Sequence, residues 1–302
     1  MTKQILRGLI LGFTLFFLGK ALKDYWYEVI TIQVDAVGWA ILSIATGVTL
    51  LAHIWGGWIW TWILHDLNQP VPCVKFIQVY LKTNIAKYLP GNIWHHYGRI
   101  VAAKNAQIPM SAATLSVLLE PLLMAAAALI MIIIFGNQFA PDYTAGSVQI
   151  LQFFSLAVVL LAVHPRFLNR VICLCQKIKK RSTTEPNVPF QVKFYPLRAL
   201  LGELGFLVLR GSGFVLTVFA LTPLHLNQLP LLLAAFSFSW LLGFLLPGAP
   251  GGLGVFEVTA IALLQHRFPS AVIISAIVFY RLVSIMAETA GAALASLDEH
   301  IT

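Results

Sequence analysis

Long apolar runs separated by short polar connections make up most of this 302-residue chain. A bilayer core about 30 Å thick needs roughly 20 apolar residues per helix, so runs of this length predict membrane-spanning helices. The predicted spans are residues 5–22, 36–64, 111–135, 147–163, 199–221 and 269–297. We therefore predict an all-α fold, a polytopic integral membrane protein with six to eight transmembrane helices.

Two breaks, near residues 84–98 and 245–256, interrupt this pattern. In the second break, two prolines and four glycines lie between Leu245 and Glu257. Pro removes a backbone donor and Gly adopts conformations that other residues avoid, so a helix must end and restart there. Irregular backbone at membrane depth needs protein or water around it. The pattern therefore predicts that residues 229–268 form either a re-entrant hairpin or two full crossings beside a cavity.

The first break lies within residues 65–110, where Lys and Arg alternate with apolar residues around Leu89-Pro90-Gly91. This region is too basic for a span and too apolar for a loop, which favours an interfacial or re-entrant segment. Leu246-Pro247-Gly248 has the corresponding place in the second break. We predict two inverted halves, 1–138 and 139–302, because each contains an odd number of crossings and one broken segment. Paired breaks of this kind are typical of a transporter's central site.

Composition and charge support a membrane domain. Hydrophobic residues make up 59% of the chain and charged residues 11%, so we expect a single membrane domain without a soluble catalytic domain. The net charge of +8 comes from basic residues beside the apolar runs. The positive-inside rule explains this distribution better than nucleic-acid binding does, and it places residues 65–110, residues 165–198 and both termini in the cytoplasm. The predicted location is a bacterial inner (plasma) membrane, with an uncleaved first span.

Four tryptophans close together, Trp55, Trp58, Trp60 and Trp62, lie at the end of the second predicted span. We interpret them as an aromatic belt at headgroup level, since Trp is enriched at membrane interfaces. Stacking on a ligand is the alternative.

Metal and cofactor chemistry find little support in the sequence. Cys73, Cys173 and Cys175 have neither disulfide nor metal-ligand spacing. His95 and His96 are adjacent and do not share a helix face, so headgroup contact or interface placement is favoured over metal binding. The sequence contains no phosphate-binding loop and no zinc-protease or nucleophile-elbow motif. We expect no metal, no cofactor, no catalytic residue set and no ATP-driven pump.

Ionisable residues inside the apolar runs are the main candidates for function. They are Glu120, Glu203, Glu257, Glu288, Arg210 and Arg281. A charge near the bilayer centre costs roughly 2.5 to 3.5 kcal/mol on insertion scales, so these side chains should face the protein interior. From a rise of about 1.5 Å per residue, the two arginines and Glu120 fall near mid-depth, with Glu203 and Glu288 nearer the cytoplasm.

Two roles for Arg210 and Arg281 follow from this placement. In the functional hypothesis they attract a lipid phosphate, because a guanidinium matches phosphate oxygens with paired donors. In the structural alternative, Glu120 and Glu257 neutralise the two arginines and lock helices together. We further predict that an Arg281→Gln protein folds but no longer translocates lipid.

Other candidate groups lie in the two breaks. Further substrate-binding candidates are Lys87, Asn92, Trp94, Arg99, Gly251, Gly252 and Gly254. The three glycines precede a new helix and could form an anion-binding nest, although Glu257 in the first turn would satisfy the same helix end. Proton relay candidates are Glu257, Glu120, Glu203 and Glu288.

Two motifs connect the chain to a known family. They are Lys87-Tyr88-Leu89-Pro90-Gly91 with Trp94 and Gly98-Arg99, and Pro250-Gly251-Gly252-Leu253-Gly254-Val255-Phe256-Glu257. With these motifs the chain resembles the flippase-like membrane family that includes the lysylphosphatidylglycerol synthase transmembrane region, the N-terminal domain of the multiple peptide resistance factor. The resemblance implies translocation of lipids with modified headgroups. Because the chain ends at Thr302 without an aminoacyl-transferase domain, the resemblance also argues against lysyl transfer.

We therefore predict a lipid translocase that moves an anionic or headgroup-modified lipid, or a polyprenyl-linked glycan, between leaflets without ATP hydrolysis. The alternative is a membrane-embedded lipid-headgroup transferase, or an accessory subunit of a lipid-modifying glycosyltransferase, with Glu257 or Glu120 as general base. The expected partner is a membrane lipid, and nucleic acid is not expected. A lipid-modifying transferase and a second copy of the chain stay open as protein partners.

Overall fold

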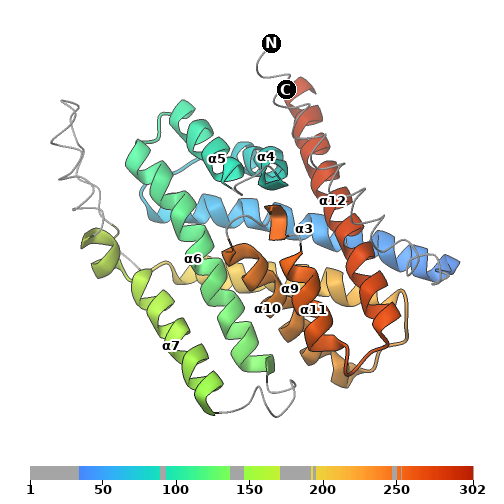
Figure 1. Cartoon of the computed structure of the whole chain (residues 1–302). Helices are drawn as coiled ribbons and strands as arrows, with labels where there is room; N and C mark the ends of the chain where they lie inside the picture. The colour runs from blue at the N-terminus through green and yellow to red at the C-terminus, as the bar shows by residue number, and fades with distance from the viewer. Residues whose placement is uncertain are drawn as a thin grey trace.

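The structure is a computed structural model that describes residues 34–88, 93–136, 146–170, 192, 195–246, 250–252 and 254–301 (Figure 1). All regular secondary structure in this part of the chain is helical, which confirms the predicted all-α class. Five described helical stretches are long and apolar enough to cross a membrane, so the chain is a multi-pass membrane protein. The predicted span 5–22 lies outside the described residues.

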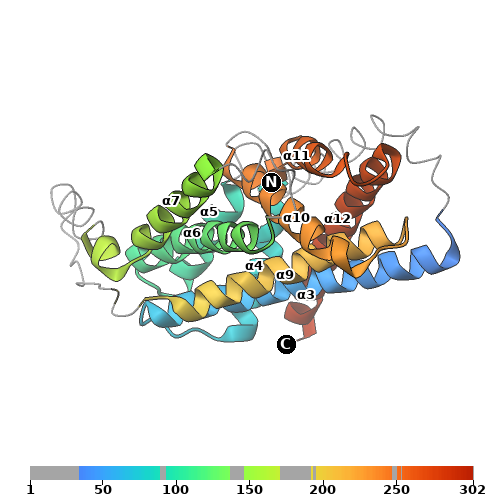
Figure 2. The same cartoon turned by 90° about the horizontal axis from the view of Figure 1, so that it is seen from below.

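Helices α3 (Ala36–Asp66) and α9 (Leu197–Phe219) form an antiparallel pair that runs along one side of the molecule (Figure 2). Small residues at their interface let the two backbones approach closely. A Cβ atom added to Gly213 would lie 2.5 Å from the Thr49 hydroxyl, and one added to Gly202 would lie 2.9 Å from Ile59. This close packing fixes His53 of α3 and Arg210 of α9 on facing surfaces, where they form a hydrogen bond.

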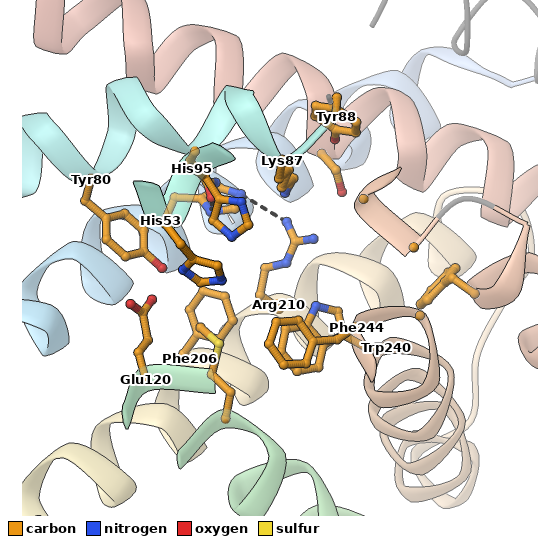
Figure 3. A pocket seen from close by; sticks show the side chains of 18 of the residues that line it. His53, Tyr80, Lys87, Tyr88, His95, Glu120, Phe206, Arg210, Trp240 and Phe244 are labelled. Atoms are coloured by element: carbon orange, nitrogen blue, oxygen red, sulfur yellow. Dashed lines mark hydrogen bonds between the residues drawn. The ribbon is translucent and has the colours of Figure 1, made fainter. Parts of the chain in front are cut away.

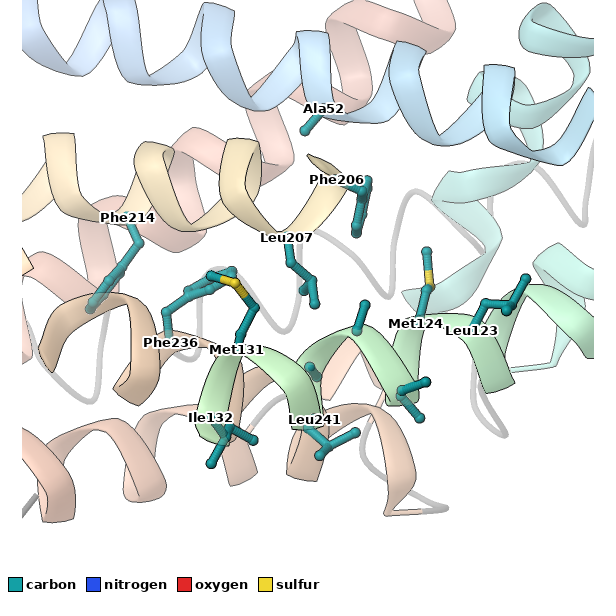
Figure 4. Close-up of a cluster of buried hydrophobic side chains, with 14 of the residues drawn as sticks. Ala52, Leu123, Met124, Met131, Ile132, Phe206, Leu207, Phe214, Phe236 and Leu241 are labelled. Atoms are coloured by element: carbon teal, nitrogen blue, oxygen red, sulfur yellow. The ribbon is translucent and has the colours of Figure 1, made fainter. Parts of the chain in front are cut away.

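Helix α6 (Met110–Phe135) crosses this pair and packs on α9 and α10 (Leu229–Leu245), with α7 (Gly146–Ala162) at its side (Figure 1). The apolar core between these helices includes Leu123, Met131, Leu207, Phe236 and Leu241, all buried (Figure 4). At 17 residues, α7 is shorter than the five candidate spans.

The first break separates α4 (Cys73–Asn84) from α5 (Trp94–Asn105), with the short 3₁₀ helix η1 (Ile85–Tyr88) between them. Each of the two α-helices has 12 residues. At 1.5 Å per residue this is about 18 Å, well short of a bilayer core of about 30 Å. Neither α4 nor α5 is long enough to cross a membrane. Their lengths therefore fit the predicted interfacial or re-entrant segment.

The second break follows the 3₁₀ helix η4 (Leu226–Gln228) and α10 (Leu229–Leu245). It contains η5 (Pro250–Gly252) and is followed by α11 (Val255–Leu264) and the long α12 (Ser270–Ile301). Residues 226–245 are long enough to cross, whereas the 10 residues of α11 cover only about 15 Å. Helix α11 alone is therefore too short to cross a bilayer core of about 30 Å, and the choice between a re-entrant hairpin and two full crossings stays a prediction. The inverted halves and the membrane orientation stay predictions.

The interpretation of the four tryptophans as one belt was wrong for Trp60. Trp55, Trp58 and Trp62 share one face of α3, with ring centroids 5.4 to 5.5 Å apart. Trp60 is fully buried on another face and donates its indole N–H to the Ser116 hydroxyl at 3.2 Å. At 3.6 residues per turn, positions 58 and 60 point in very different directions, so a cluster in sequence does not form a single belt.

Candidate functional site

A cavity of about 880 Å³, counting the part open to solvent, lies where the two breaks meet (Figure 3). Side chains from η1, η5 and eight α-helices line it, namely α3, α4, α5, α6, α9, α10, α11 and α12. The breaks touch directly, because the Tyr88 ring lies against Gly251. The predicted helix interruptions thus enclose a shared cavity in the middle of the molecule.

Gly251 and Gly252 shape the second break. Their φ angles are 59° and 72°, a left-handed conformation that favours glycine. A Cβ atom on Gly251 would lie 2.8 Å from the Tyr88 ring, and one on Gly252 would lie 3.2 Å from the Cα atom of Gly243. Both positions therefore need glycine for backbone conformation and for close approach.

Arg281 of α12 holds this break in place. Its Nε atom donates to Glu257 Oε1 at 2.5 Å, while Nη1 and Nη2 donate to the carbonyls of Gly251 and Gly252 at 2.9 and 3.1 Å. Glu257 also accepts the backbone N–H of Gly254 at 2.6 Å. The carboxylate thus lies at the start of α11, where an anion in the predicted nest would bind.

A second polar group joins the first break to α3, α9 and α12. Lys87 Nζ lies 2.6 Å from Glu288 Oε1, and His53 Nε2 lies 3.2 Å from the same oxygen. The same Nε2 lies 3.1 Å from Arg210 Nη1. A ring nitrogen either donates or accepts, so His53 can hydrogen bond with Glu288 or with Arg210 through Nε2, but not with both at once.

Arg210 stands out because it lacks a carboxylate partner among the described residues. It is only 6% exposed, and its Nε atom is buried without a hydrogen-bond partner. Figure 3 places it between the polar side chains of Lys87 and His53 and the rings of Trp240 and Phe244. A buried cation aimed into an open cavity is the feature expected of an anion-binding site.

Arg99, Glu120 and Glu203 make a third group. Arg99 Nη1 donates to Glu120 Oε2 at 2.6 Å, and the guanidinium lies 3.6 Å from the centre of the Tyr80 ring. The structural alternative is therefore wrong for Glu120, which pairs with Arg99, and right for Glu257, which pairs with Arg281. Glu203 is fully buried, and neither of its carboxyl oxygens has a hydrogen-bond partner. The buried charges meet in three groups, which a depth estimate along each helix could not predict.

The remaining wall of the cavity is aromatic. The Trp240 and Phe244 rings are stacked with centroids 5.2 Å apart, and Phe206 meets Trp240 edge-on. Each cavity cation also lies over a ring. The pairs are Lys87 with Tyr88, Arg99 with Tyr80, Arg210 with Tyr280 and Arg281 with Phe256, at 5.3, 3.6, 5.5 and 5.2 Å from the ring centroids.

His95 and His96 line the cavity with ring centroids 3.8 Å apart. Burial lowers the pKa of both rings, which lie outside the membrane-spanning helices, and the pKa of His96 falls from 6.5 to about 3. Both are therefore neutral at neutral pH, and their Nδ1 atoms are buried without a hydrogen-bond partner. Within the described ranges, no three His, Cys, Asp or Glu side chains come together to hold a metal ion.

Most predicted site residues converge on this cavity. Those that line it are Lys87, Arg99, Glu120, Arg210, Gly251, Gly252 and Arg281. Glu257, Gly254, Glu288 and Glu203 lie in the surrounding shell. Trp94 is 44% exposed and does not line it, and Asn92 lies outside the described residues.

Sequence reasoning missed part of the cavity wall. The overlooked residues include His53, Tyr80, Asn84, Phe206, Trp240, Phe244 and Tyr280. His53 could have been found, because it is an ionisable residue within the apolar run 36–64 and such residues mark function in membrane segments. The aromatic residues carry no such signal, since their sequence pattern is that of ordinary lipid-facing or core positions.

One known family is similar to this chain over nearly its whole length. The family model described as "Lysylphosphatidylglycerol synthase TM region" matches residues 4–291 of the chain. No curated protein matches the chain.

Proposed function

This chain belongs to the family of the lysylphosphatidylglycerol synthase transmembrane region, and from that premise we propose that it moves an anionic lipid between membrane leaflets without ATP hydrolysis. The family assigns a role connected with membrane lipids. The cavity between the two breaks supports the more specific proposal, because its cations face a space accessible to solvent.

The proposal depends on one observation, the position of Arg210. A phosphate crossing hydrocarbon without partners would be very costly, so a translocated headgroup needs charged protein groups on its route. Arg210 is buried, points into the cavity and lacks a carboxylate partner in the described part of the chain. A phosphate oxygen would supply the missing anion for its guanidinium.

The same geometry suggests how the two breaks cooperate. Tyr88 lies against Gly251, and Lys87 is paired with Glu288, so these contacts hold the breaks and α12 together. Loosening them would widen the cavity toward one side. In the proposed cycle the headgroup occupies the cavity, the acyl chains stay in lipid, and the halves rock about this layer as inverted-repeat transporters do.

The transferase alternative needs a general base. Both candidates are already engaged, since Glu120 accepts a hydrogen bond from Arg99 and Glu257 accepts from Arg281 and Gly254. A carboxylate stabilised by a guanidinium holds a proton poorly, so this arrangement favours the translocase.

The test uses purified protein in liposomes that contain phosphatidylglycerol labelled on an acyl chain. A membrane-impermeant quencher then reports how fast the label reaches the outer leaflet. We predict exchange between leaflets with an unchanged lipid mass, whereas a transferase would change the mass.

Arg210→Gln is the matched variant for this assay. It should slow leaflet exchange by about tenfold or more, because a charge-assisted hydrogen bond contributes roughly 1.5 to 3 kcal/mol. Arg198→Gln on the same helix is the control, since Arg198 is exposed and lies over Trp62, outside the cavity. An Arg210→Gln protein that folds and exchanges lipid as fast as the control would refute the proposal.

A further inference from the structure

Glu203 of α9 lies in the shell around the cavity and has an unusual carboxyl group. The residue is fully buried, and both carboxyl oxygens lack a hydrogen-bond partner among the described residues. The charged side chains close enough to act on it are Glu120 of α6 and Arg99 of α5. Burying an ionised carboxylate without partners is very costly, so Glu203 holds a proton in this arrangement.

Arg99 has an unused donor beside this carboxyl group. Its Nη1 atom donates to Glu120 Oε2 at 2.6 Å, but its Nε atom is buried without a hydrogen-bond partner. Glu120 and Arg99 both line the cavity, which is open to solvent, whereas Glu203 does not. One guanidinium can therefore bind two carboxylates through different nitrogen atoms, and Glu120 offers Glu203 a connection to solvent.

The other elements packed around α9 bring no further charge to this point. Helix α3 presents Ile59 and Trp62 to Gly202, the residue before Glu203, and α10 contains no ionisable residue. The ionisable groups of α3 and α12 have partners elsewhere: His53 with Arg210, His65 with Asp66, Tyr280 with the Arg210 carbonyl, Arg281 with Glu257 and Glu288 with Lys87.

Tyr80 of α4 is the remaining ionisable group near Glu203, and its ring lies 3.6 Å from the Arg99 guanidinium. Burial and the charge of Glu120 raise the pKa of Tyr80 well above 10, so its hydroxyl keeps its proton. A proton that binds and leaves at this point must therefore use a carboxyl group.

Charge balance links this proton to the headgroup. Four cations line the cavity, and three of them pair with carboxylates. The pairs are Lys87 with Glu288, Arg99 with Glu120 and Arg281 with Glu257, which leaves Arg210. With Glu203 protonated, the excess positive charge matches one phosphate. With Glu203 ionised, the protein charges balance without a phosphate. Because an uncompensated buried charge is costly, the headgroup and the proton should bind together and leave together.

We propose that Glu203 is the proton site of a co-transport mechanism, in which one proton crosses the membrane with each anionic headgroup and in the same direction. This inference rests on the function proposed above and adds the ion that drives it. While a headgroup occupies the cavity, Glu203 keeps its proton. When the headgroup leaves, the O–H bond of Glu203 breaks and the proton passes to the Glu120 carboxylate and on to the solvent of the cavity. The Arg99 Nε atom then binds the ionised Glu203.

A pH difference across liposomes tests the coupling. The full chain is reconstituted in phosphatidylcholine vesicles with a trace of phosphatidylglycerol labelled on an acyl chain, and an impermeant quencher measures the label in the outer leaflet. We predict that the label accumulates in the leaflet facing the more alkaline solution, up to about tenfold for one pH unit, because one proton accompanies each lipid. A protonophore should abolish the accumulation. A label distribution that ignores the pH difference while exchange continues would overturn the proposal.

Glu203→Gln imitates a carboxyl group that never loses its proton. This protein should still exchange labelled lipid, but it should distribute the label equally between leaflets at any pH difference. Arg198→Gln on the same helix is the matched control and should accumulate the label as the wild type does. Accumulation by the Glu203→Gln protein at the wild-type level would assign the proton to another group. Glu203→Leu serves the same purpose if the Gln variant fails to fold, since the position is fully buried.

Proton uptake in detergent separates this proposal from translocation itself. When phosphatidylglycerol is added to the wild-type protein in a weakly buffered solution, proton uptake should grow toward about one per bound lipid as the pH is raised, because linked binding is reciprocal. The Glu203→Gln protein should take up none. Absence of uptake by the wild type at every pH would overturn the proton site. Uptake without any leaflet exchange would refute the translocase while keeping the link between proton and lipid.

Discussion

Two neighbouring carboxyl groups, Glu120 and Glu203, are both buried but differ in their partners. Glu120 accepts a hydrogen bond from Arg99 at 2.6 Å, whereas both oxygens of Glu203 lack one. Burying an ionised carboxylate without partners is very costly, so we infer that Glu203 carries a proton in this conformation. Among the proton relay candidates, Glu203 is therefore the one that we expect to release a proton when a cation approaches its carboxyl group.

Substitution by Gln tests this difference at the residue scale. Glu203→Gln keeps the shape of a protonated carboxyl, so the melting temperature in detergent should stay unchanged or rise. Glu120→Gln leaves Arg99 buried without its counter-charge and should cost about 3 to 5 kcal/mol of stability. Thermal unfolding followed by tryptophan fluorescence measures both variants. Equal destabilisation by the two would show that Glu203, like Glu120, is ionised and paired with a cation.

Individual residues also show the limit of prediction from sequence. Arg210 and Arg281 were predictable because a charge within an apolar run needs a protein environment, and Lys87 and Arg99 because they lie in the first break. Their partners were not all identified, since the partner depends on how helices pack. Depth placed Glu120 with Arg210 and Arg281, yet Glu120 pairs with Arg99 of α5, the helix that follows the first break.

At the scale of elements, the second break depends on one side chain from another helix. Arg281 binds Glu257 and the carbonyls of Gly251 and Gly252 simultaneously. The expectation that Arg281→Gln preserves the fold therefore changes. Removing the guanidinium would leave Glu257 charged and buried and would release two carbonyls of the break.

We now predict that Arg281→Gln lowers the melting temperature in detergent, with a cost of about 3 to 5 kcal/mol, as for other broken buried ion pairs. The double variant with Arg281→Gln and Glu257→Gln should recover part of the stability lost in the Arg281→Gln protein, because no unpaired charge then remains. Differential scanning fluorimetry of the two single variants and the double variant gives the coupling. Additive losses would mean that Arg281 acts independently of Glu257 and is free to bind the substrate.

Helix boundaries were predictable because their causes are local. The predicted spans 36–64 and 111–135 correspond to α3 and α6, which begin or end within two residues of those limits. The second break begins after Leu245 and the chain becomes helical again at Val255, as Pro and Gly require. The length of α11 was not predictable, since the turn after Leu264 has no equally strong signal in the sequence.

At the scale of the whole molecule, the two breaks meet as the paired pattern suggested. Tyr88 lies against Gly251, and both line the same cavity. The aromatic side of that cavity could not be predicted, because Phe206, Trp240 and Phe244 read as ordinary apolar positions until α9 and α10 are placed together. Helix packing, rather than any local motif, creates the surface opposite the cations.

Chemical blocking of the cavity tests the central claim most directly. In a protein whose native cysteines are replaced, Ser284→Cys places a thiol in the cavity and Ser296→Cys places one on the exposed face of the same helix. An anionic methanethiosulfonate reagent adds a sulfonate that would compete for Arg210. We predict that labelling at position 284 stops leaflet exchange of phosphatidylglycerol in proportion to the labelled fraction, while labelling at position 296 leaves the rate unchanged. Full labelling of position 284 with exchange at the wild-type rate would contradict the cavity as the lipid route.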